Sequence, residues 1–333
     1  MKKYNVGILG ATGAVGREMM KILEERNFPI GELRLLASPR SVGKKIEFKG
    51  EEITIKLAEE SAFEGLDIVL GAASNAVAKQ FAPHIVKAGA VFVDNSSAFR
   101  MCDDVPLVVP EINGEDVKKN NGIISNPNCS TIITLVAVNA INQLSKIKGM
   151  IASTYQATSG AGAEGPVELR NQMNAIVNGG EITHTVFQHQ IAENVIPHIG
   201  SFGENGYTAE EMKMQNEGRK ILHLPELKVT CTCVRVPVVR SHSISVTVVT
   251  EDKLTVAQVR DAVANAKGCK LYDNGENKEY PMPLVTSDQD LVFVGRIRED
   301  LVFDNALTLW CCGDQVRKGA ATNAIQIAEE LIK

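Results

Sequence analysis

The sequence lacks the patterns that would indicate a disulfide-stapled, metal-binding or membrane-spanning protein. Its seven cysteines are irregularly spaced and form no C-x-x-C pair, which argues against a disulfide framework or a structural zinc site. No apolar run approaches the roughly 20 residues that a membrane-spanning helix needs. The net charge of -5 gives no sign of a nucleic-acid surface. The opening MKKYNVGILG lacks the apolar region and cleavage site of a signal peptide, so we expect a cytoplasmic location.

The chain also has no internal repeat, low-complexity tract or long linker, and its 333 residues are enough for two domains. In the first part, apolar runs that read as strands alternate with helical patterns. Such β-α-β alternation predicts a parallel, doubly wound sheet. The expected strands are residues 4–11, 32–38, 67–73, 90–96 and 122–128, and the expected helices are residues 16–26 and 75–89.

The pattern changes after Cys129. Strand candidates lie near one another with separate helices between them, which predicts an α+β domain on a mixed or antiparallel sheet. Cys231 and Cys233 alternate within one candidate, so both are expected on one face of that strand. Asp314 is the expected N-cap of an amphipathic last helix, residues 314–333. The strand candidates are residues 148–158, 227–238, 243–250, 291–300 and 306–312, and the other helix candidates are 131–144, 163–179, 208–222 and 255–266.

A glycine loop follows the first expected strand. Gly10, Gly13 and Gly16 have G-x-x-G-x-x-G spacing between a strand and a helix. Glycine there lets the backbone approach a pyrophosphate, and the helix N-terminus favours negative charge. The spacing differs from the commonest dinucleotide-binding pattern, and a simple tight turn is the alternative. The context predicts a Rossmann-type nucleotide domain, whose candidate cofactor contacts are Gly10, Ala11, Thr12, Gly13, Ala14 and Val15.

The end of the second expected strand bears on the choice between NAD and NADP. NAD sites often place a carboxylate there for the ribose 2′-hydroxyl, but this chain has Ser38, Arg40 and Ser41. Arg40 can pair with a 2′-phosphate and the hydroxyls can hydrogen-bond to it. The alternative is a solvated basic loop. The sequence favours NADP.

Cys129 has a setting unlike that of the other cysteines. It lies in SNPNCST, at or near the start of the apolar helix 131–144, where free N–H groups and the helix dipole favour a thiolate. A thiolate and a nicotinamide cofactor together suggest oxidation of an aldehyde. The thiolate adds to the carbonyl, a hydride passes to the cofactor, and phosphate or water cleaves the thioester. Such a site needs a base and a cation for a substrate carboxylate or phosphate.

Arg235 and His242 are candidates for these roles, but their spacing raises a question. They are seven positions apart, and strict strand alternation would place them on opposite faces of a sheet. Pro237 lies between them and can interrupt the strand. The facing can then be reset, so the spacing permits one shared site without requiring it.

Several motifs occur in order along nearly the whole chain. They are GATGAVG (10–16), SPRSVGK (38–44), VDNSSAFRM (93–101), VPEIN (109–113), SNPNCST (125–131), YQATSGAG (155–162), NVIPHIG (194–200), NEGRKIL (216–222), VRVPVVRSHS (234–243) and CGDQVRKGAATNAIQ (312–326). Together these motifs resemble the aspartate-β-semialdehyde dehydrogenase family, and its bacterial type in particular. The combination is highly specific.

The resemblance implies an NADP-dependent enzyme that interconverts L-aspartate-β-semialdehyde and L-4-aspartyl phosphate in lysine, methionine and threonine synthesis. We also expect a homodimer, with a homotetramer as a further alternative, and no metal. The resemblance also implies that the last helix returns to the first domain. The expected domains are therefore an NADP-binding part, residues 1–128 and 314–333, and a catalytic and dimerisation part, residues 129–313.

The resemblance also implies roles for individual residues. Cys129 would form the thioester, His242 would act as acid and base, and Arg235 would bind the substrate α-carboxylate in a bidentate pair. Glu217 and Lys220 are three apart on one helical face, so the plainer alternative for them is a surface ion pair. Asn128 would help to shape the site, and Gln156 would help to position the cysteine and the substrate. The other implied roles are Glu217 facing the substrate amino group, Arg100 and Lys220 binding phosphate, Ser159 and Gly160 lining the cofactor, Gln315 touching its nicotinamide end, and Asn95 lying nearby.

Three other functions remain open at this point. N-acetyl-γ-glutamyl-phosphate reductase shares the chemistry, but its substrate lacks a free amino group. Glyceraldehyde-3-phosphate dehydrogenase shares a cysteine after SN, but it needs a sugar-phosphate site. A non-catalytic NADP-binding regulatory protein would not need the cysteine. The intact set of Cys129, Gln156, Arg235 and His242 favours an enzyme.

Overall fold

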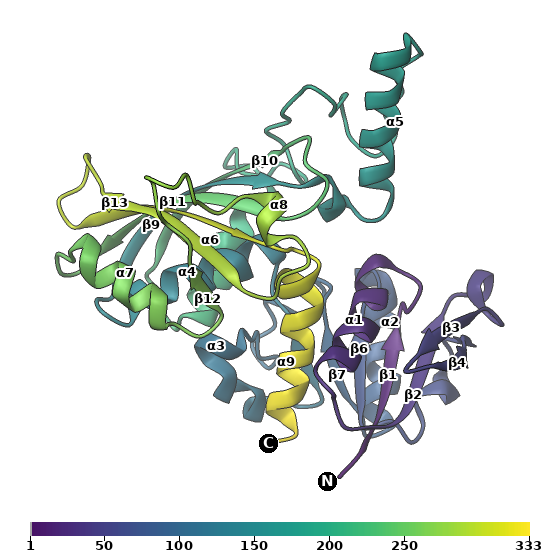
Figure 1. Ribbon diagram of the computed structural model, residues 1–333. Helices are drawn as coiled ribbons and strands as arrows, with labels where there is room; N and C mark the ends of the chain where they lie inside the picture. The colour runs from purple at the N-terminus through teal and green to yellow at the C-terminus, as the bar shows by residue number, and fades with distance from the viewer. Residues whose placement is uncertain (1) are drawn as a thin grey trace. The chain divides into compact units, whose positions relative to one another are not determined.

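The computed structural model describes residues 2–333, which form two compact units (Figure 1). The first unit comprises the chain up to Asn128 together with Ala320–Lys333, and the second comprises Cys129–Gly319. Residues 314–319, expected in the nucleotide-binding part, lie in the second unit. The carboxylate of Asp314 accepts hydrogen bonds there from Arg240 Nε at 2.6 Å and from the backbone of Asp288 at 2.7 Å.

The first unit is built on a parallel sheet with the order β5-β2-β1-β6-β7-β8. All of its strand pairs are parallel, and α1 lies between β1 and β2 while α2 lies between β6 and β7. The doubly wound fold expected from the sequence is confirmed. Its elements are β1 (Tyr4–Leu9), α1 (Ala14–Glu25), β2 (Ile30–Ala37), β5 (Lys56–Leu57), β6 (Ile68–Gly71), α2 (Asn75–Lys87), β7 (Val91–Asp94), β8 (Ile123–Ser125) and α9 (Thr322–Leu331).

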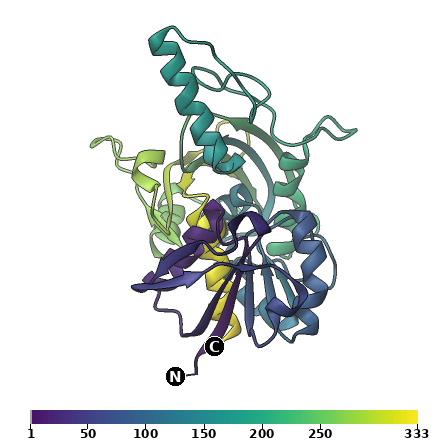
Figure 2. The same cartoon turned by 90° about the vertical axis from the view of Figure 1, so that its right-hand side faces the viewer.

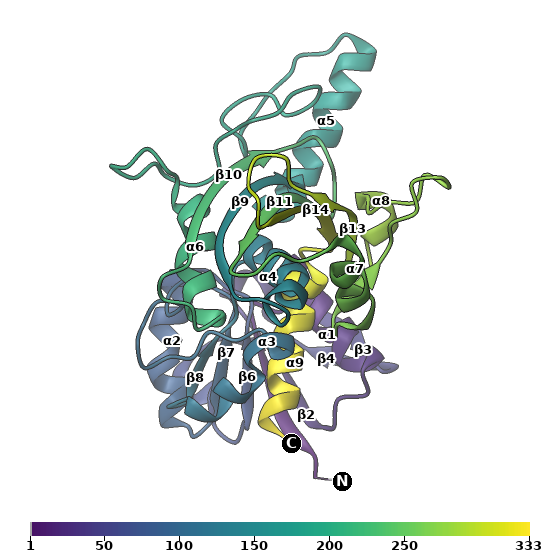
Figure 3. The ribbon, with the colours of Figure 1, turned by 90° about the vertical axis from the view of Figure 1, so that its left-hand side faces the viewer.

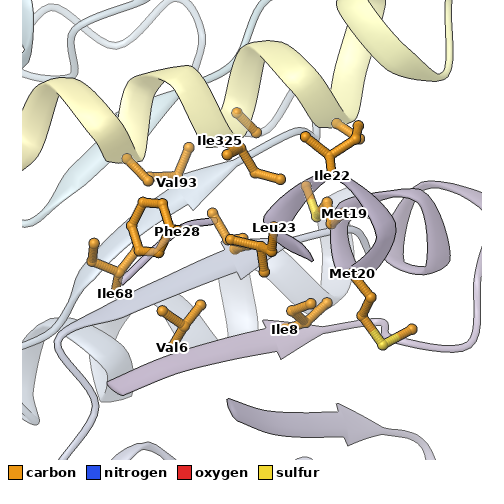
Figure 4. Close-up of a cluster of buried hydrophobic side chains, with 14 of the residues drawn as sticks. Val6, Ile8, Met19, Met20, Ile22, Leu23, Phe28, Ile68, Val93 and Ile325 are labelled. Carbon is orange, nitrogen blue, oxygen red and sulfur yellow. The ribbon is translucent and has the colours of Figure 1, made fainter. Parts of the chain in front are cut away.

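Alternate strand residues enter two different cores, because successive side chains point to opposite faces of a sheet. On one face, β1 side chains such as Ile8 pack with Ile22 of α1 and Ile325 of α9 (Figure 4). On the other face, Leu9 packs with residues of α2 such as Phe81. Helices therefore cover both faces, which explains why the central strands read as continuous apolar runs.

Some elements of the first unit were not expected from the sequence. The hairpin of β3 (Lys45–Phe48) and β4 (Glu51–Thr54) and the short strand β5 follow the second strand. Much of the hairpin is exposed, so its sequence is polar and carries no apolar run. The unit also contains the short helix α3 (Pro110–Asn113).

The second unit is built on a mixed sheet with the order β10-β9-β11-β14-β13-β12. The outer pairs β10–β9 and β12–β13 are parallel, and the inner pairs are antiparallel. The expected α+β architecture with a mixed sheet is confirmed. The strands are β9 (Ile147–Gln156), β10 (Lys228–Arg235), β11 (His242–Thr250), β12 (Cys269–Leu271), β13 (Val292–Glu299) and β14 (Ala306–Gly313).

Helices pack on one face of this sheet (Figure 3). α4 (Cys129–Asn142) packs against the central strands, α6 (Ala209–Ile221) against β10, and α7 (Val256–Asn265) against β12 and β13. Cys231 and Cys233 both point to this buried face, as expected, with their sulfurs 3.8 Å apart. The unit also contains α5 (Glu164–Asn178), which projects from the sheet in Figure 2, and the short helix α8 (Pro283–Thr286).

α6 also covers the outer edge of β10. The backbone N–H of Val229 donates to Gln215 and that of Cys233 donates to Glu211, at 3.1 and 3.0 Å. An edge strand with unpaired N–H groups can pair with another chain and aggregate. The Gln215 and Glu211 side chains protect this edge, because they accept hydrogen bonds from two of its N–H groups. They also hold the end of β10 close to the first turn of α6.

The last helical segment is not one regular helix from Asp314. The Asp314 carboxylate accepts hydrogen bonds from the N–H groups of Val316 and Arg317 at 2.9 and 3.1 Å, as an N-cap does. A π-helical turn follows at Arg317–Ala321, and the α-helix begins only at Thr322. Single π-turns often occur at functional sites. Along residues 2–333, none of the helices is long and apolar enough to cross a membrane.

Candidate active site

In the first unit, the glycine loop turns sharply between β1 and α1. Gly10 has φ +93°, and a Cβ there would lie 2.5 Å from the carbonyl oxygen of Ala72. A Cβ at Gly16 would lie 2.4 Å from the carbonyl oxygen of Gly10. Neither position can hold a side chain without moving the backbone. The loop is therefore built for close backbone approach at the N-terminus of α1.

A cavity of about 450 Å³ opens beside this loop at the carboxyl ends of β1 and β2. Ligands bind in this position in doubly wound folds. Of the loop candidates, Ala11 is fully buried in the core, while Ala14 is exposed at the start of α1. The cavity is lined by Leu9, Gly10, Thr12, Gly13, Ala37, Ser38, Pro39, Ala58, Ala72, Ala73, Val77, Gln80 and Phe81.

The three residues expected to select NADP lie at the rim of this cavity or just beyond it. Ser38 lines the cavity, and Arg40 and Ser41 follow it in a single 3₁₀ turn, Pro39–Ser41. Ser38 and Arg40 are exposed. A guanidinium that faces water is available to pair with a phosphate.

A second group of polar residues follows β7 and β8 in the same unit. The Asn95 side chain donates to the carbonyl of Gly71 and accepts from Asn126, both at 2.7 Å. Asn126 in turn accepts from Asn323 of α9, also at 2.7 Å. Arg100 is buried and donates from Nη2 to the carbonyl of Asn95 at 2.8 Å. Asn95 and Arg100 are thus brought together at the carboxyl edge of the sheet. Asn128, also buried, is the last residue of this unit before α4.

In the second unit, strand register places three of the predicted site residues in one row. Arg235 pairs with Gln156 across β10 and β9, and Ser243 pairs with Tyr155, so His242 lies opposite Gln156 on β11. Residues paired across strands point to the same face. β10 ends at Arg235 and β11 begins at His242, so the loop between them resets the alternation. Arg235, Gln156 and His242 therefore share the helix-covered face.

The backbone of Ala157, just after β9, ties two of these side chains together. Its N–H donates to Nδ1 of His242 at 3.0 Å, and its carbonyl accepts from Nη1 of Arg235 at 2.6 Å. Because Nδ1 accepts a hydrogen bond, the proton of the neutral imidazole lies on Nε2. This Nε2 has no hydrogen-bond partner within residues 2–333. It is a buried donor that a substrate oxygen can satisfy.

Gly160 leaves the space between Arg235 and His242 open. A Cβ at this position would lie 2.8 Å from Arg235 Nη1 and 3.0 Å from His242 Cε1. Gly160 belongs to a 3₁₀ turn, Thr158–Ala161, which is held to the loop before β11. The N–H of Thr158 donates to Val238 at 2.7 Å. Glycine at 160 is therefore part of the shape of the row.

The charges in this row act on one another. Burial lowers the pKa of Arg235, while negative charge at Cys129 and Glu210 acts in the opposite direction. The pKa of His242 falls to about 3, because the ring is fully buried and because Arg235 opposes its protonation. His242 is therefore neutral at physiological pH. Arg235 keeps its charge, because the guanidinium is not deprotonated in proteins.

Cys129 is the first residue of α4, which packs on the same face of the sheet. Gly319 separates it from Gln315, since a Cβ at 319 would lie 3.0 Å from Cys129 Cβ and 3.4 Å from Gln315 Cβ. Gln315 accepts from the N–H of Ser241 at 2.8 Å and donates to the hydroxyl of Ser159. Ser159 and Gln315 are both predicted near the cofactor. Through these hydrogen bonds they also hold Ser241, the residue before His242, in place. In residues 2–333, no group of His, Cys, Asp and Glu side chains could hold a metal ion.

Two family models match most of the chain. Residues 5–120 match "Semialdehyde dehydrogenase, NAD binding domain", and residues 138–318 match "Semialdehyde dehydrogenase, dimerisation domain". The first match covers the glycine loop, Arg40 and Arg100. The second covers Gln156, Arg235, His242 and all six strands of the mixed sheet.

Similar proteins extend over the full length. An aspartate-semialdehyde dehydrogenase from Aquifex aeolicus is 52% identical over 99% of this chain and 98% of its own length. The enzyme of that name from Bacillus subtilis is 47% identical over 99% of this chain and 97% of its own. A crystal structure of aspartate semialdehyde dehydrogenase II from Vibrio cholerae, complexed with ASA, has a TM-score of 0.97 at 43% identity. It covers 100% of this chain and 99% of that one.

The chain belongs to the aspartate-semialdehyde dehydrogenase family. The resemblance drawn from the motifs is confirmed, and so are the α/β fold and the presence of an NAD-binding and a dimerisation domain. Membership in this family also sets aside the two alternative enzymes and the non-catalytic regulatory protein as hypotheses for the function of the chain.

Two residues near the aspartate-semialdehyde dehydrogenase motifs were missed in the sequence. Asn126, in SNPN, links Asn95 to Asn323 in the first unit. Glu210, at the start of α6, accepts from Nε2 of Gln156 at 3.2 Å and pairs with Lys213 at 2.7 Å. Its spacing to Lys213 is the same as that of Glu217 to Lys220, so only the register of α6 on the sheet distinguishes the two pairs.

Glu217 and Lys220, the pair expected from the sequence, lie further along α6 than Glu210. Glu217 is buried and Lys220 is partly exposed. α6 runs back along β10, because Glu211 meets Cys233 and Gln215 meets Val229. Glu217 is two turns from Glu210, roughly 10 Å at 1.5 Å per residue. Glu210, at the N-terminal end of α6, therefore contacts the row of Gln156, Arg235 and His242 through Gln156.

Proposed function

We propose that the chain catalyses reversible, phosphate-dependent oxidation of L-aspartate-β-semialdehyde to L-4-aspartyl phosphate with NADP, through a thioester on Cys129. Its family gives the aspartate-semialdehyde dehydrogenase activity. The observation that carries the mechanism is the row of Gln156, Arg235 and His242 in the same unit as Cys129. The reductive direction, toward lysine, methionine and threonine, is the proposed biosynthetic one, and the cytoplasm is the proposed location.

The residues of the first unit fit a dinucleotide. Gly10 and Gly16 allow a tight turn before α1 that a side chain at either position would prevent, and the adjoining cavity has room for an adenosine portion. When bound, a nicotinamide cofactor supplies a hydride acceptor. Ser38, Arg40 and Ser41 would hold the 2′-phosphate of NADP, which supports NADP over NAD.

Cys129 and His242 would perform the covalent chemistry. The thiolate at the start of α4 attacks the aldehyde carbon, and the carbonyl oxygen becomes an oxyanion. His242 Nε2–H, which has no hydrogen-bond partner among residues 2–333, would hydrogen-bond to that oxyanion and release it as the C=O re-forms with loss of hydride. Phosphate attack on the thioester then forms the acyl phosphate and returns the thiolate. Gln156 and Asn128 would orient the cysteine and the substrate.

Arg235 would bind the α-carboxylate of the substrate. Within residues 2–333, its guanidinium has one hydrogen-bond acceptor, the carbonyl oxygen of Ala157, so several N–H groups remain for a carboxylate. For the amino group, two carboxylates on α6 are candidates. Family resemblance suggests Glu217, and contact with Gln156 favours Glu210. We propose Glu210 as the carboxylate that faces the ammonium group.

Basic side chains in each unit would bind inorganic phosphate. Arg100 is buried beside Asn95 in the first unit. On α6, Lys220 follows from the resemblance, and Lys213 is the lysine paired with Glu210. Each supplies the positive charge that a phosphate needs.

The second unit would also form a homodimer, and two dimers could pair into a tetramer. Ile151 and Tyr155 of β9 are exposed on the face of the sheet opposite Cys231 and Cys233, and Tyr155 packs against Trp310 at 5.3 Å. Aromatic residues on an uncovered face are typical of interfaces. The match to a dimerisation domain supports this use of the face.

The decisive experiment is NADP reduction with L-aspartate-β-semialdehyde, with and without inorganic phosphate. N-acetylglutamate semialdehyde and glyceraldehyde-3-phosphate serve as parallel substrates. We expect turnover only with the first substrate, and only with phosphate present. Activity on another aldehyde alone would contradict the substrate assignment.

The chain offers a matched control for the nucleophile. Cys129 and Cys102 are the two partly exposed cysteines, and the others are buried. Cys129→Ser should abolish turnover while NADP still binds, and Cys102→Ser should leave turnover unchanged. Equal loss in both variants would remove the covalent role of Cys129.

A further inference from the structure

α5 carries two buried polar side chains that the reaction above does not use. Glu168 is 7% exposed, and its carboxylate accepts hydrogen bonds from the backbone of Thr185, Val186 and Phe187 at 2.6, 2.6 and 3.3 Å. Burial raises the pKa of Glu168, but these N–H donors outweigh burial and hold it below its ordinary value. The ionised carboxylate therefore fixes three consecutive residues of the following segment.

Gln172, one turn further along α5, holds the next part of that segment. Its oxygen accepts from the N–H groups of Ile191 and Ala192 at 2.9 and 3.0 Å. Its nitrogen donates to the carbonyl of Thr183 at 3.0 Å. The segment then pairs with the site strand, because Ile196 exchanges two backbone hydrogen bonds with Arg235, at 2.9 and 2.8 Å. α5 thus acts as a template for residues 183–196.

Phe187 is the last of the three residues whose backbone N–H groups donate to Glu168. Its ring lies under the guanidinium of Arg235. The guanidinium carbon is 5.8 Å from the ring centroid, within the range of a cation–π contact. The ring is nearly buried and packs with Leu169 and Ile191. A Cβ at Gly165 would lie 3.3 Å from the tip of the ring, so the start of α5 lies close to that tip. The ring has little freedom to move.

We propose that Phe187, set by Glu168, is a positioning residue for Arg235, and this proposal rests on the proposed carboxylate-binding role of Arg235. The aromatic face stabilises the guanidinium and sets its height above the ring. The N–H groups of Arg235 that do not donate to Ala157 are left to meet the carboxylate in a bidentate pair. Phe187 itself contacts neither the aldehyde nor the cofactor in this scheme.

The test compares Phe187→Leu, which keeps an apolar side chain without a ring, with Phe187→Tyr, which keeps the aromatic face. We expect Phe187→Leu to raise KM for L-aspartate-β-semialdehyde about fivefold with kcat changed less than about twofold, since one partly desolvated cation–π contact is lost. Phe187→Tyr should retain the wild-type KM. With 3-aminopropanal, which lacks the carboxylate, Phe187→Leu and wild type should have the same kcat/KM.

Ile191→Ala is the structural control, because Ile191 belongs to the same cluster but has no aromatic ring to face the guanidinium. It should lower Tm and leave KM unchanged. The proposal is overturned if Phe187→Leu leaves KM unchanged, if Ile191→Ala raises KM as much, or if 3-aminopropanal turnover falls equally. Arg235→Lys distinguishes a failure of the carboxylate-binding role of Arg235 from a failure of the positioning role of Phe187. If it leaves KM unchanged, the role of Arg235 is wrong; if it raises KM while Phe187→Leu does not, only the positioning role fails.

Discussion

Replacement of Gly160 by alanine tests the geometry of the row most directly. Gly160 does not have a positive φ, so its backbone accepts alanine without strain. The added methyl group would lie 2.8 Å from Arg235 Nη1 and 3.0 and 3.2 Å from His242 Cε1 and Nε2. Its cost therefore falls on the two functional side chains rather than on the chain conformation.

The size of the effect follows from these distances. Ordinary van der Waals contact begins at 3.4 Å, so the methyl group is about 0.6 Å too close to Arg235. The guanidinium can move only by straining its 2.6 Å hydrogen bond to Ala157, and His242 is fully buried. A displacement on the order of 1 Å at a reacting centre can cost ~100-fold in rate. We expect kcat/KM to fall by about 10- to 100-fold, with an overpacking cost of about 1–3 kcal/mol in stability.

Gly179→Ala provides the matched control. Gly179 has φ +67° at the end of α5, and apart from its chain neighbours no atom of residues 2–333 lies within 4 Å of an added Cβ, so alanine there costs about 1–2 kcal/mol of backbone strain. The two variants should show similar small drops in Tm, but only Gly160→Ala should lose activity. NADP binding measured in both variants detects a lost cofactor contact at Gly160. Wild-type kcat/KM in Gly160→Ala, or an equal loss in Gly179→Ala, would refute the argument.

Three other changes test separate parts of the molecule. Glu210→Gln should raise KM for the semialdehyde by about tenfold or more, because a charged partner is lost, whereas Glu217→Gln should not; the reverse order would support Glu217. Arg40→Ala should raise KM for NADP about 10- to 100-fold and leave KM for NAD unchanged, and equal effects on both would remove Arg40 from the 2′-phosphate site. Glu168 has a lowered pKa, so its contribution to stability is present above the ordinary carboxyl value of 4.5 and disappears as pH falls through the folded-state pKa. The Tm difference between wild type and Glu168→Gln should therefore be largest near neutral pH and shrink in acid, and a difference independent of pH would contradict this.

The parts of the fold that the sequence predicted well are those that depend on local pattern. The alternation of strands and helices up to Asn128 is confirmed, because buried parallel strands are apolar along their whole length. β3, β4 and β5 were missed, since exposed short strands carry no such signal. The last helix begins at Thr322 rather than at Asp314, because a π-helical turn intervenes, and helical periodicity does not reveal that turn.

The residues of the site also divide into those that local sequence predicted and those that only the packed structure located. The position of Cys129 at a helix start was predicted from its neighbours, and α4 begins there. The spacing of Arg235 and His242 left their shared face open, because it depends on the loop between β10 and β11. Glu210 was missed for a similar reason, since Glu210 and Glu217 have the same lysine spacing and only the register of α6 brings Glu210 to Gln156.

The sequence by itself determined the two sheet types, the glycine turn, the basic residues after β2 and the cysteine at a helix N-terminus. It also determined the family. The family follows from motifs spread along nearly the whole chain, whereas each of the other features depends on residues within a few positions of one another, where sterics and periodicity act directly. Tertiary structure alone decided that Gln156, Arg235 and His242 form one row, and that Phe187 lies beneath Arg235. Those contacts join residues dozens of positions apart, and strand register, loop geometry and the buried anchors on α5 settle them only when the chain is packed.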